Sequence, residues 1–178
     1  EMDIRDYKGE LVISHDIADE NCILAKEMLD IYSEYGGNLT LAFNIKSDGL
    51  QMKLKKLLEE YDIKNYFVFD MSIPDGLQYL KEDIALFTRE SEYEVSPAFY
   101  VEASGIWLDE FKGHWITQEV IERHINSHKK LCIVSPDLHK REYQKEWEHY
   151  KKIEKKLGLN NIMICTDFPE IARGFFNE

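Results

Sequence analysis

Seven short apolar runs recur along the chain, and stretches with helical spacing lie between them. The runs are LVISH (11–15), LTLAFNI (39–45), YFVFD (66–70), IALFT (84–88), GIWLD (105–109), LCIVS (131–135) and NIMICT (161–166). They are rich in β-branched and aromatic residues, and most of them are apolar throughout instead of alternating with polar residues. Such runs are typical of parallel strands that are buried on both faces. The sequence therefore predicts a largely parallel sheet.

The stretches between the runs carry helical patterns. The expected helices occupy residues 22–35, 48–61, 116–127, 137–157 and 168–176. Gly36 and Gly37 are expected to end the first helix, Asp48 to cap the second, and Pro169 to lie in the first turn of the last. Strands and helices that alternate without a repeat or a linker predict one α/β domain over residues 1–178.

The ends of the predicted strands distinguish between an open sheet and a closed barrel. No glycine-rich phosphate loop follows the early strands, so a dinucleotide-binding open sheet has no support. Polar residues instead follow most runs, namely His15-Asp16, Asn44 and Lys46, Asp70 and Ser72, Thr88-Arg89, Asp109, Ser135 and Thr166-Asp167. Barrel enzymes build their sites at these ends. Because such barrels need at least ~200 residues, we expect a (β/α)8 TIM-type barrel whose first strand precedes this numbering.

Composition excludes some classes of partner. The formal net charge of −12 opposes broad nucleic-acid binding, because a phosphate backbone would be repelled. No apolar run approaches the ~18 residues that a transmembrane helix needs. Cys22, Cys132 and Cys165 show no metal-ligand spacing, and the last two lie in apolar runs and are expected to be buried. An odd number of cysteines without a disulfide framework favours a reducing cytoplasm.

Candidate catalytic groups begin at the first residue. Glu1 and Asp3 are two positions apart, so on a strand they face the same side, and paired carboxylates suit Mg²⁺ or Ca²⁺. The alternative interpretation is that both carboxylates are exposed to solvent at a strand end, since Arg5 and the aspartate after it continue the run of charged residues. His15 has the chemistry of a general acid for a departing alcohol, although a histidine at a strand end is more often structural. Along a regular strand, Asp16 would point away from it.

Three further residues are candidates for contact with a substrate. Lys46 follows an apolar strand and suits a phosphate oxygen; a Schiff-base lysine of a barrel aldolase is the rival interpretation. Arg89 is expected either to clamp a phosphate oxygen or to pair with a neighbouring glutamate. Trp107 would fill the barrel or form the floor of the pocket. The remaining histidines are expected at the surface: His114, His124, His128, His139 and His149.

Several motifs resemble those of glycerophosphodiester phosphodiesterases. The first is Glu1-Met2-Asp3, then Lys8-Gly9-Glu10-Leu11-Val12, then Ser14-His15-Asp16, which is similar to the family's second strand with its Glu-x-Asp, glycine turn and His-Asp. Ile164-Cys165-Thr166-Asp167-Phe168-Pro169 with Ala172-Arg173 is similar to its last strand and Thr-Asp-x-Pro turn, and Phe43-Asn44-Ile45-Lys46 stands in place of its Glu-Ile-Lys strand. The family's His-Arg-Gly strand has no counterpart in this sequence.

The resemblance implies a metal-assisted hydrolase of small glycerol- or sugar-linked phosphodiesters. It places Glu1, Asp3 and Asn44 on a divalent cation, although the family has a carboxylate where this chain has Asn44. It gives His15 an acid–base or nucleophilic role and makes Lys46 both catalytic and phosphate-binding. Arg89 and Trp107 are expected as further substrate contacts from their own chemistry. Two alternatives stay open. One is a ligand-binding barrel that has lost turnover, which Asn44 favours; the other is metal-free, phospholipase-C-like chemistry through a cyclic phosphate.

Overall fold

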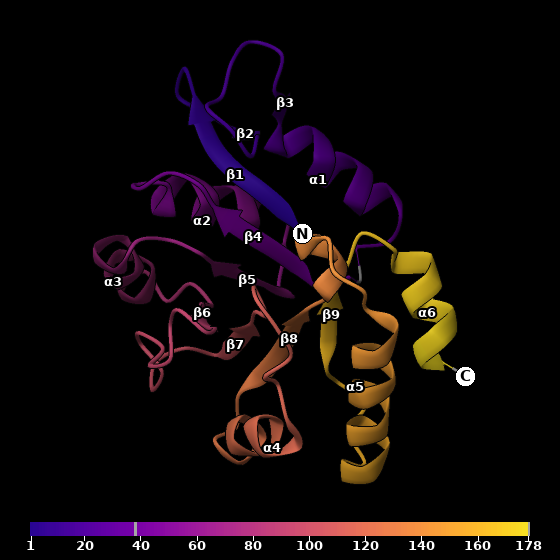
Figure 1. The fold of residues 1–178 in the computed structure, drawn as a ribbon. Coiled ribbons are helices and arrows are strands. Elements are labelled where there is room, and N and C mark those ends of the chain that lie inside the picture. Colours follow the sequence, from indigo (N-terminus) through magenta and orange to yellow (C-terminus); the bar gives the residue numbers. More distant parts are fainter. Residues whose placement is uncertain (38, 178) are drawn as a thin grey trace. The chain divides into compact units, whose positions relative to one another are not determined.

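The computed structural model describes residues 1–37 and 39–177. The chain forms two compact units, Glu1–Phe87 and the residues from Thr88 onward. Each unit has a sheet of its own, with five strands in the first and four in the second (Figure 1). Both combine strands with helices that follow them in sequence, so the described residues form a mixed α/β fold with parallel strands, as predicted.

The sheet of the first unit has the strand order β3-β2-β1-β4-β5. Its strands are β1 (Met2–Tyr7), β2 (Glu10–Ile13), β3 (Ile23–Leu24), β4 (Leu41–Ile45) and β5 (Tyr66–Phe69). The pairs β1–β4 and β4–β5 are parallel, whereas β2 is antiparallel to both β1 and β3. The prediction of a parallel strand at LVISH is therefore wrong. Lys8 (φ 48°) and Gly9 (φ 91°) adopt left-handed conformations that make the tight turn of a hairpin.

Three helices belong to the first unit: α1 (Ala25–Glu34), α2 (Gln51–Glu60) and α3 (Ile73–Lys81). Helix α3 was not predicted from the sequence. It carries Pro74 in its first turn and is capped by Ser72, whose Oγ accepts a bond from the Asp75 N–H. Asp48 does not cap α2, because that helix starts at Gln51 without a side-chain cap; its carboxylate instead accepts a bond from Ser72 Oγ.

The sheet of the second unit has the order β6-β7-β8-β9. Its strands are β6 (Phe87–Glu90), β7 (Gly105–Leu108), β8 (Lys130–Val134) and β9 (Met163–Cys165), and its helices are α4 (Gln118–Asn126), α5 (Gln144–Leu157) and α6 (Pro169–Asn177). Among the described residues, no helix lies between β6 and β7, whereas α4 lies between β7 and β8 and α5 between β8 and β9. The long helix predicted at 137–157 is interrupted, because a 3-10 turn (Pro136–His139) ends at Lys140, which has a φ of 57°.

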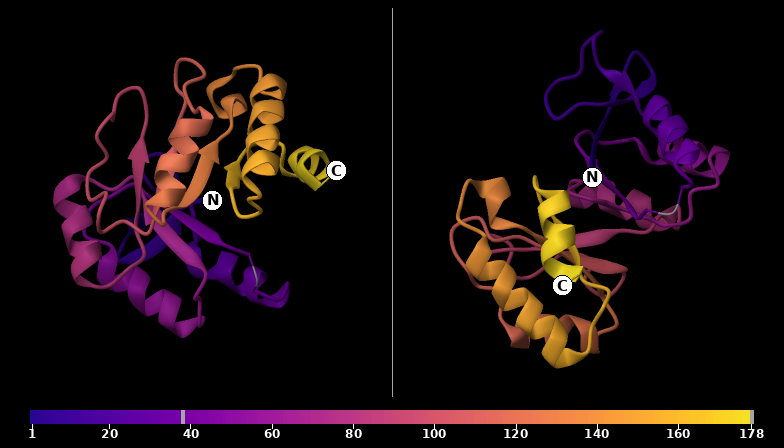
Figure 2. Two further views of the ribbon diagram at one scale, coloured as in Figure 1. Left: turned by 90° about the horizontal axis from the view of Figure 1, so that it is seen from below. Right: turned by 90° about the vertical axis from the view of Figure 1, so that its right-hand side faces the viewer.

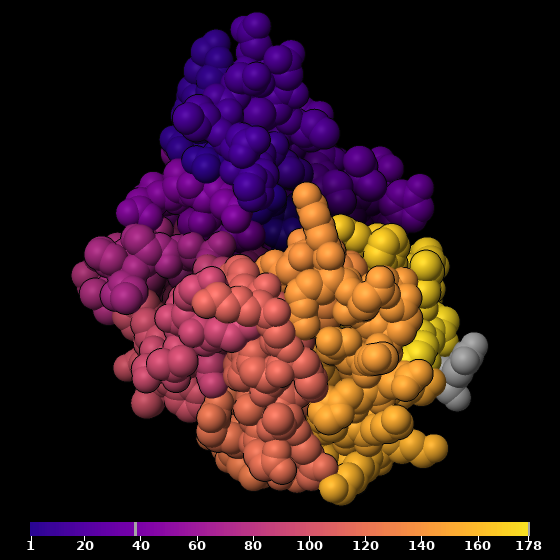
Figure 3. All heavy atoms as spheres, viewed as in Figure 1, coloured from indigo at the N-terminus to yellow at the C-terminus, as the bar shows by residue number. Residues whose placement is uncertain are grey.

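Helices α4, α5 and α6 bury one apolar face each in the second unit. Ile121 of α4, Trp147 of α5 and Ala172 of α6 share a buried cluster with Ile106 of β7 and Ile133 of β8. Figures 1 and 2 show α6 beside α5, and the space-filling view shows that side chains occupy the space that the ribbons leave between them (Figure 3). Full burial of each large side chain contributes about 1.5–3 kcal/mol, so this cluster fixes the carboxyl ends of β7 and β8.

Two expectations about the whole chain also have outcomes. Among the described helices, none has the length and apolar character needed to cross a membrane. All three cysteines are free thiols; Cys132 is buried as predicted, but Cys165 is only half-buried. The closed eight-stranded barrel and the single domain stay predictions.

Candidate functional site

A group of charged and polar side chains lies where β1 and β4 run side by side. Asp3 of β1 is the register partner of Asn44 of β4 in the parallel ladder, so their side chains emerge next to each other. Lys46 is the first residue after β4, and its backbone N–H donates to the Ile4 carbonyl at 3.0 Å. The two strands therefore place Asp3, Asn44 and Lys46 together, as the sequence analysis predicted for site residues.

The Lys46 ammonium lies between two carboxylates. Its Nζ is 3.5 Å from Asp3 Oδ1 and 3.6 Å from Asp70 Oδ2, and all three side chains are about four-fifths buried (17%, 22% and 20% exposed). Asp70 follows β5, which pairs with β4, so it comes from the next strand of the same sheet. We call Glu1, Asp3, Asn44, Lys46 and Asp70 the lysine–carboxylate group.

Glu1 adds negative charge to this group. The residue as a whole is exposed, but partial desolvation of its carboxylate and the negative charge of Asp3 raise its pKa, while a hydrogen bond with the Asn44 side chain and the charge of Lys46 act in the opposite direction. Desolvation of the carboxylate is the largest cause of the raised pKa, and repulsion by Asp3 is the second. Both effects disfavour the charged carboxylate, so additional positive charge at this position would stabilise it.

The oxygen atoms of the lysine–carboxylate group fit a hard divalent cation in their chemistry. Asp3 Oδ1 and Asn44 Oδ1 are both buried and accept no hydrogen bond. Carboxylate and amide oxygens are the ligands that Mg²⁺ and Ca²⁺ accept. Within the part of the chain that the structure describes, however, no three His, Cys, Asp or Glu side chains are grouped for a metal. The donors that the sequence analysis assigned to a cation are the carboxylates of Glu1 and Asp3 and the amide of Asn44, and the Lys46 ammonium supplies positive charge beside them.

His15 follows the hairpin that brings the chain back toward Asp3. Ile4 pairs with Ile13, and the Ser14 N–H donates to the Asp3 carbonyl at 3.0 Å, so His15 is one residue beyond the partner of Asp3. Its side chain is 73% exposed. The Nδ1 atom lies 3.1 Å from Asp16 Oδ1, which contradicts the expectation that Asp16 points away. That expectation assumed a regular strand, but β2 ends at Ile13.

Arg89 and Trp107 belong to the second unit. Arg89 Nε is 2.6 Å from Glu94 Oε2, and its Nη1 is 3.8 Å from Asp109 Oδ2. The alternative of an ion pair with a neighbouring glutamate is thus confirmed, while the phosphate clamp stays a prediction. Trp107 lies buried in β7, which agrees with its expected role as a core residue; its contact with a substrate stays a prediction.

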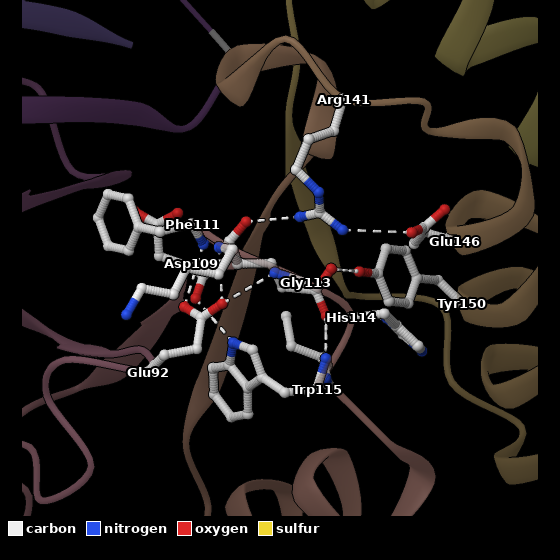
Figure 4. A network of polar contacts seen from close by, with 12 residues as sticks. Glu92, Asp109, Phe111, Gly113, His114, Trp115, Arg141, Glu146 and Tyr150 are labelled. Atoms are coloured by element: carbon white, nitrogen blue, oxygen red, sulfur yellow. Dashed lines mark hydrogen bonds and ion pairs between the residues drawn. The ribbon is translucent and has the colours of Figure 1, made fainter.

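The loop that follows β7 is held by two glutamates (Figure 4). Glu92 accepts the backbone N–H groups of Phe111, Lys112 and Gly113 at 2.8–3.1 Å. Glu110 is fully buried; it accepts bonds from the backbone of Trp115 and Ile116, from the His114 ring and from the Tyr150 hydroxyl. Both carboxylate oxygens of Glu92 and both of Glu110 therefore have a hydrogen-bond donor, and these bonds fix the loop in position.

Two features of these groups were not predicted from the sequence. Asp70 was noted at a strand end, but its pairing with Lys46 was not predicted. Three histidines predicted at the surface are not fully exposed: His124 is fully buried against Glu90 and Tyr100, His139 is mostly buried against Asp109, and His149 is half-buried. The strand-end positions of Asp70 and Asp109 were the available signal. The histidine positions follow from packing between segments far apart in sequence, which spacing does not reveal.

Comparisons with known proteins find similarity in structure only. No family model matches the chain, and no curated protein does. A crystal structure of a glycerophosphodiester phosphodiesterase from Parabacteroides distasonis ATCC 8503 matches with a TM-score of 0.62 and 11% identity, over 99% of this chain and 82% of that one. A second, from Agrobacterium tumefaciens str. C58, matches with a TM-score of 0.57 and 12% identity, over 92% of this chain and 81% of that one.

The chain has the fold of glycerophosphodiester phosphodiesterases. The resemblance that the motifs indicated is thereby confirmed at the level of the fold. At 11–12% identity, the likeness extends to architecture and not to individual site residues. The roles of those residues depend on the geometry described above.

Proposed function

We propose that the protein is a hydrolase of small glycerol- or sugar-linked phosphodiesters and resembles the glycerophosphodiester phosphodiesterases in activity as well as in fold. The observation that carries this proposal is the placement of Asp3, Asn44 and Lys46 together at neighbouring parallel strands of that fold. In our proposal the strands form a TIM-type barrel, whose sites lie at the carboxyl ends of its strands. The three free cysteines support a reducing, cytoplasmic location.

In this proposal Glu1, Asp3 and Asn44 would hold a divalent cation, Mg²⁺ or Ca²⁺. The support is the chemistry of the donors and the two buried oxygens, Asp3 Oδ1 and Asn44 Oδ1, that accept no hydrogen bond. When bound, such an ion supplies positive charge that stabilises the negative charge of a phosphodiester in its transition state. Asn44 contributes a neutral oxygen where the family has a carboxylate, so we expect the ion to be bound weakly.

Lys46 and His15 have separate roles. Lys46 is held at a fixed position by Asp3 and Asp70, and it would steady a phosphate oxygen by its charge. His15 would donate a proton to the oxygen of the departing alcohol. Its exposed imidazole is accessible, and Asp16 holds Nδ1, which leaves Nε2 to face the substrate. The roles of Arg89 and Trp107 as substrate contacts stay predictions from the sequence.

A metal-independent phosphodiesterase is the second candidate. It is favoured by the Lys46 ammonium, which already balances Asp3 and Asp70 without an added ion. Such an enzyme would release a cyclic phosphate. A protein that binds phosphate without turnover is the third candidate, and Asn44 is the feature in its favour.

The test is hydrolysis of bis(p-nitrophenyl) phosphate by the full chain with Mg²⁺, with Ca²⁺ and with chelator. We expect turnover that requires a divalent ion and falls by about 100-fold or more in Asp3→Asn and Lys46→Met. The matched control is Lys53→Met, because Lys53 is an exposed lysine of α2. Turnover that survives chelator and yields a cyclic product from a natural diester would select the second candidate. Stabilisation by glycerol phosphate without any turnover would select the third.

A further inference from the structure

Two neighbouring loops of the first unit are joined by contacts that continue from the lysine–carboxylate group. One loop follows β4 and carries Lys46, and the other follows β5 and carries Asp70. Two residues beyond this ion pair on each loop, the Ser72 hydroxyl donates to the Asp48 carboxylate, with both oxygens 3.0 Å from Oγ. The loops are therefore tied together immediately after the residues that they contribute to the candidate site.

Asp75 makes a second tie between the same loops. Its Oδ1 atom accepts the backbone N–H of Gly49 at 2.9 Å and also accepts the side-chain amide of Gln51. Its own backbone N–H donates to Ser72 Oγ at 3.3 Å, so it also holds the serine that contacts Asp48. The residue lies in α3 and is 6% exposed. A buried carboxylate thus binds both the turn before α2 and the first turn of α3.

This arrangement carries a cost in free energy. Asp75 Oδ2 is buried and has no hydrogen-bond partner in the part of the chain that the structure describes. Burial of a carboxylate without a full set of donors is unfavourable. Asp70 adds to the cost, because its φ of 70° is a left-handed conformation that residues other than glycine adopt rarely. Unfavourable groups of this kind gather where a structure holds side chains in position for function.

The geometry links Asp75 to the surroundings of the Lys46 ammonium. The Lys46 backbone is fixed to β1, since its N–H donates to the Ile4 carbonyl. Asp70 comes two residues before Ser72, so the bonds of Ser72 and Asp75 to the opposite loop set how near Asp70 comes to the ammonium. The Lys46 Nζ and Asp70 Oδ2 atoms are 3.6 Å apart. Misplacement of a catalytic group by about 1 Å can cost about 100-fold in rate.

We propose that Asp75 is a positioning residue of the phosphodiester hydrolysis, which holds Asp70 and thereby the Lys46 ammonium where a phosphate oxygen binds. The inference rests on the proposed function and concerns the same site. All of the residues involved belong to the first unit. Asp75 neither contacts the substrate nor transfers a proton; its hydrogen bonds keep the loop after β4 and the start of α3 together.

The test measures kcat and KM of the full chain for bis(p-nitrophenyl) phosphate, under the conditions in which the wild type is most active. Asp75→Ala removes the acceptor, so kcat/KM is expected to fall by about 10–100-fold. KM should rise, because the displaced Lys46 no longer meets a phosphate oxygen, whereas a smaller folded fraction would lower kcat alone. Asp75→Asn keeps Oδ1 as an acceptor and should recover most of this loss.

Tyr79→Phe is the matched control. Tyr79 lies one turn after Asp75 in α3 and is 0% exposed, and its hydroxyl has no hydrogen-bond partner among residues 1–37 and 39–177. The change removes a buried polar group from the same helix without breaking a bond, so kcat and KM should equal those of the wild type. The double variant Asp75→Ala/Lys46→Met should lose little more activity than Lys46→Met, because both changes act through the same ammonium.

The outcomes separate this inference from the proposed function. An active wild type overturns the inference and leaves the function standing if Asp75→Ala matches it, if Asp75→Ala lowers kcat at constant KM, or if its loss multiplies with that of Lys46→Met. A wild type that hydrolyses no phosphodiester overturns both. Circular dichroism measures the folded fraction of each variant. Gln51→Met replaces Asp75→Ala if that protein does not fold, because it removes a donor to Asp75 with little change in volume, and the same rise in KM is expected.

Discussion

Replacement of Lys46 by methionine removes the positive charge from the lysine–carboxylate group with little change in volume. Its Nζ is 3.5 Å from Asp3 and 3.6 Å from Asp70. At an effective dielectric constant of ~20, each contact corresponds to about 4–5 kcal/mol of Coulomb attraction. Desolvation and loss of side-chain entropy offset much of this, and the side chains are one-fifth exposed. We therefore expect Lys46→Met to lower the free energy of unfolding by about 2–4 kcal/mol.

Urea unfolding of the full chain measures this loss, with Lys53→Met as the matched control. The double variant Asp3→Asn/Lys46→Met should lose less free energy of unfolding than the sum of the losses in the two single variants, and the difference should be about 1–2 kcal/mol. Millimolar Mg²⁺ or Ca²⁺ should restore part of the stability of Lys46→Met, because an ion can then balance Asp3 and Asp70. A loss below about 0.5 kcal/mol, equal to the control, would refute the role of Lys46 as the balancing charge.

Three further predictions concern other contacts. Burial alone would raise the pKa of Glu92, but the backbone N–H groups of Lys112, Gly113 and Phe111 outweigh it and lower the pKa. Ionised Glu92 therefore stabilises the folded protein fully above pH 4.5, the pKa of an ordinary glutamate, and this stabilisation is lost as the pH falls through the lower pKa of the folded state. In urea unfolding, the stability of Glu92→Gln should lack this pH dependence. Tyr150→Phe should cost about 1–3 kcal/mol in thermal unfolding, because it leaves the buried Glu110 Oε2 without its donor. Isothermal titration with Ca²⁺ should show weaker binding by Asp3→Asn and tighter binding by Asn44→Asp than by the wild type; equal affinity in all three proteins would exclude these side chains as ligands.

Much of the strand pattern was predictable because apolar runs record burial on both faces. Every predicted run overlaps a strand of the structure, although β6 begins three residues later than expected. The first strand, β1, was not among the runs, because it alternates buried Met2 and Ile4 with polar Asp3 and Arg5. Alternation is the mark of a strand whose two faces differ. In this strand it also brings Asp3 to the polar side, where the candidate site lies.

The direction of β2 and the start of α3 depended on turn chemistry. Lys8-Gly9 is a two-residue turn with positive φ at both positions, which specifies a hairpin and so an antiparallel strand. Ser72 followed by Pro74 is a helix-start signal that is present in the sequence. These two features were legible in the sequence, whereas the break at Lys140 was not marked by glycine or proline at that residue.

The candidate site was predicted in part. The family resemblance predicted that Asp3, Asn44 and Lys46 gather, and the parallel register between Asp3 and Asn44 brings them together in the structure. Strand position was not sufficient for partners set by side-chain packing, such as Asp70 with Lys46 or Asp109 with His139. The resemblance in motifs anticipated the fold, which the solved phosphodiesterases share at 11–12% identity.

The most direct test is ³¹P NMR of a glycerophosphodiester incubated with the full chain and Mg²⁺ or Ca²⁺. We predict that the diester signal is replaced by that of a phosphomonoester, and that Asp3→Asn slows this conversion by about 100-fold or more while Lys53→Met does not. A diester signal that persists with the wild-type protein, or conversion at the same rate with Asp3→Asn, would contradict the assignment of the lysine–carboxylate group as a phosphodiesterase site.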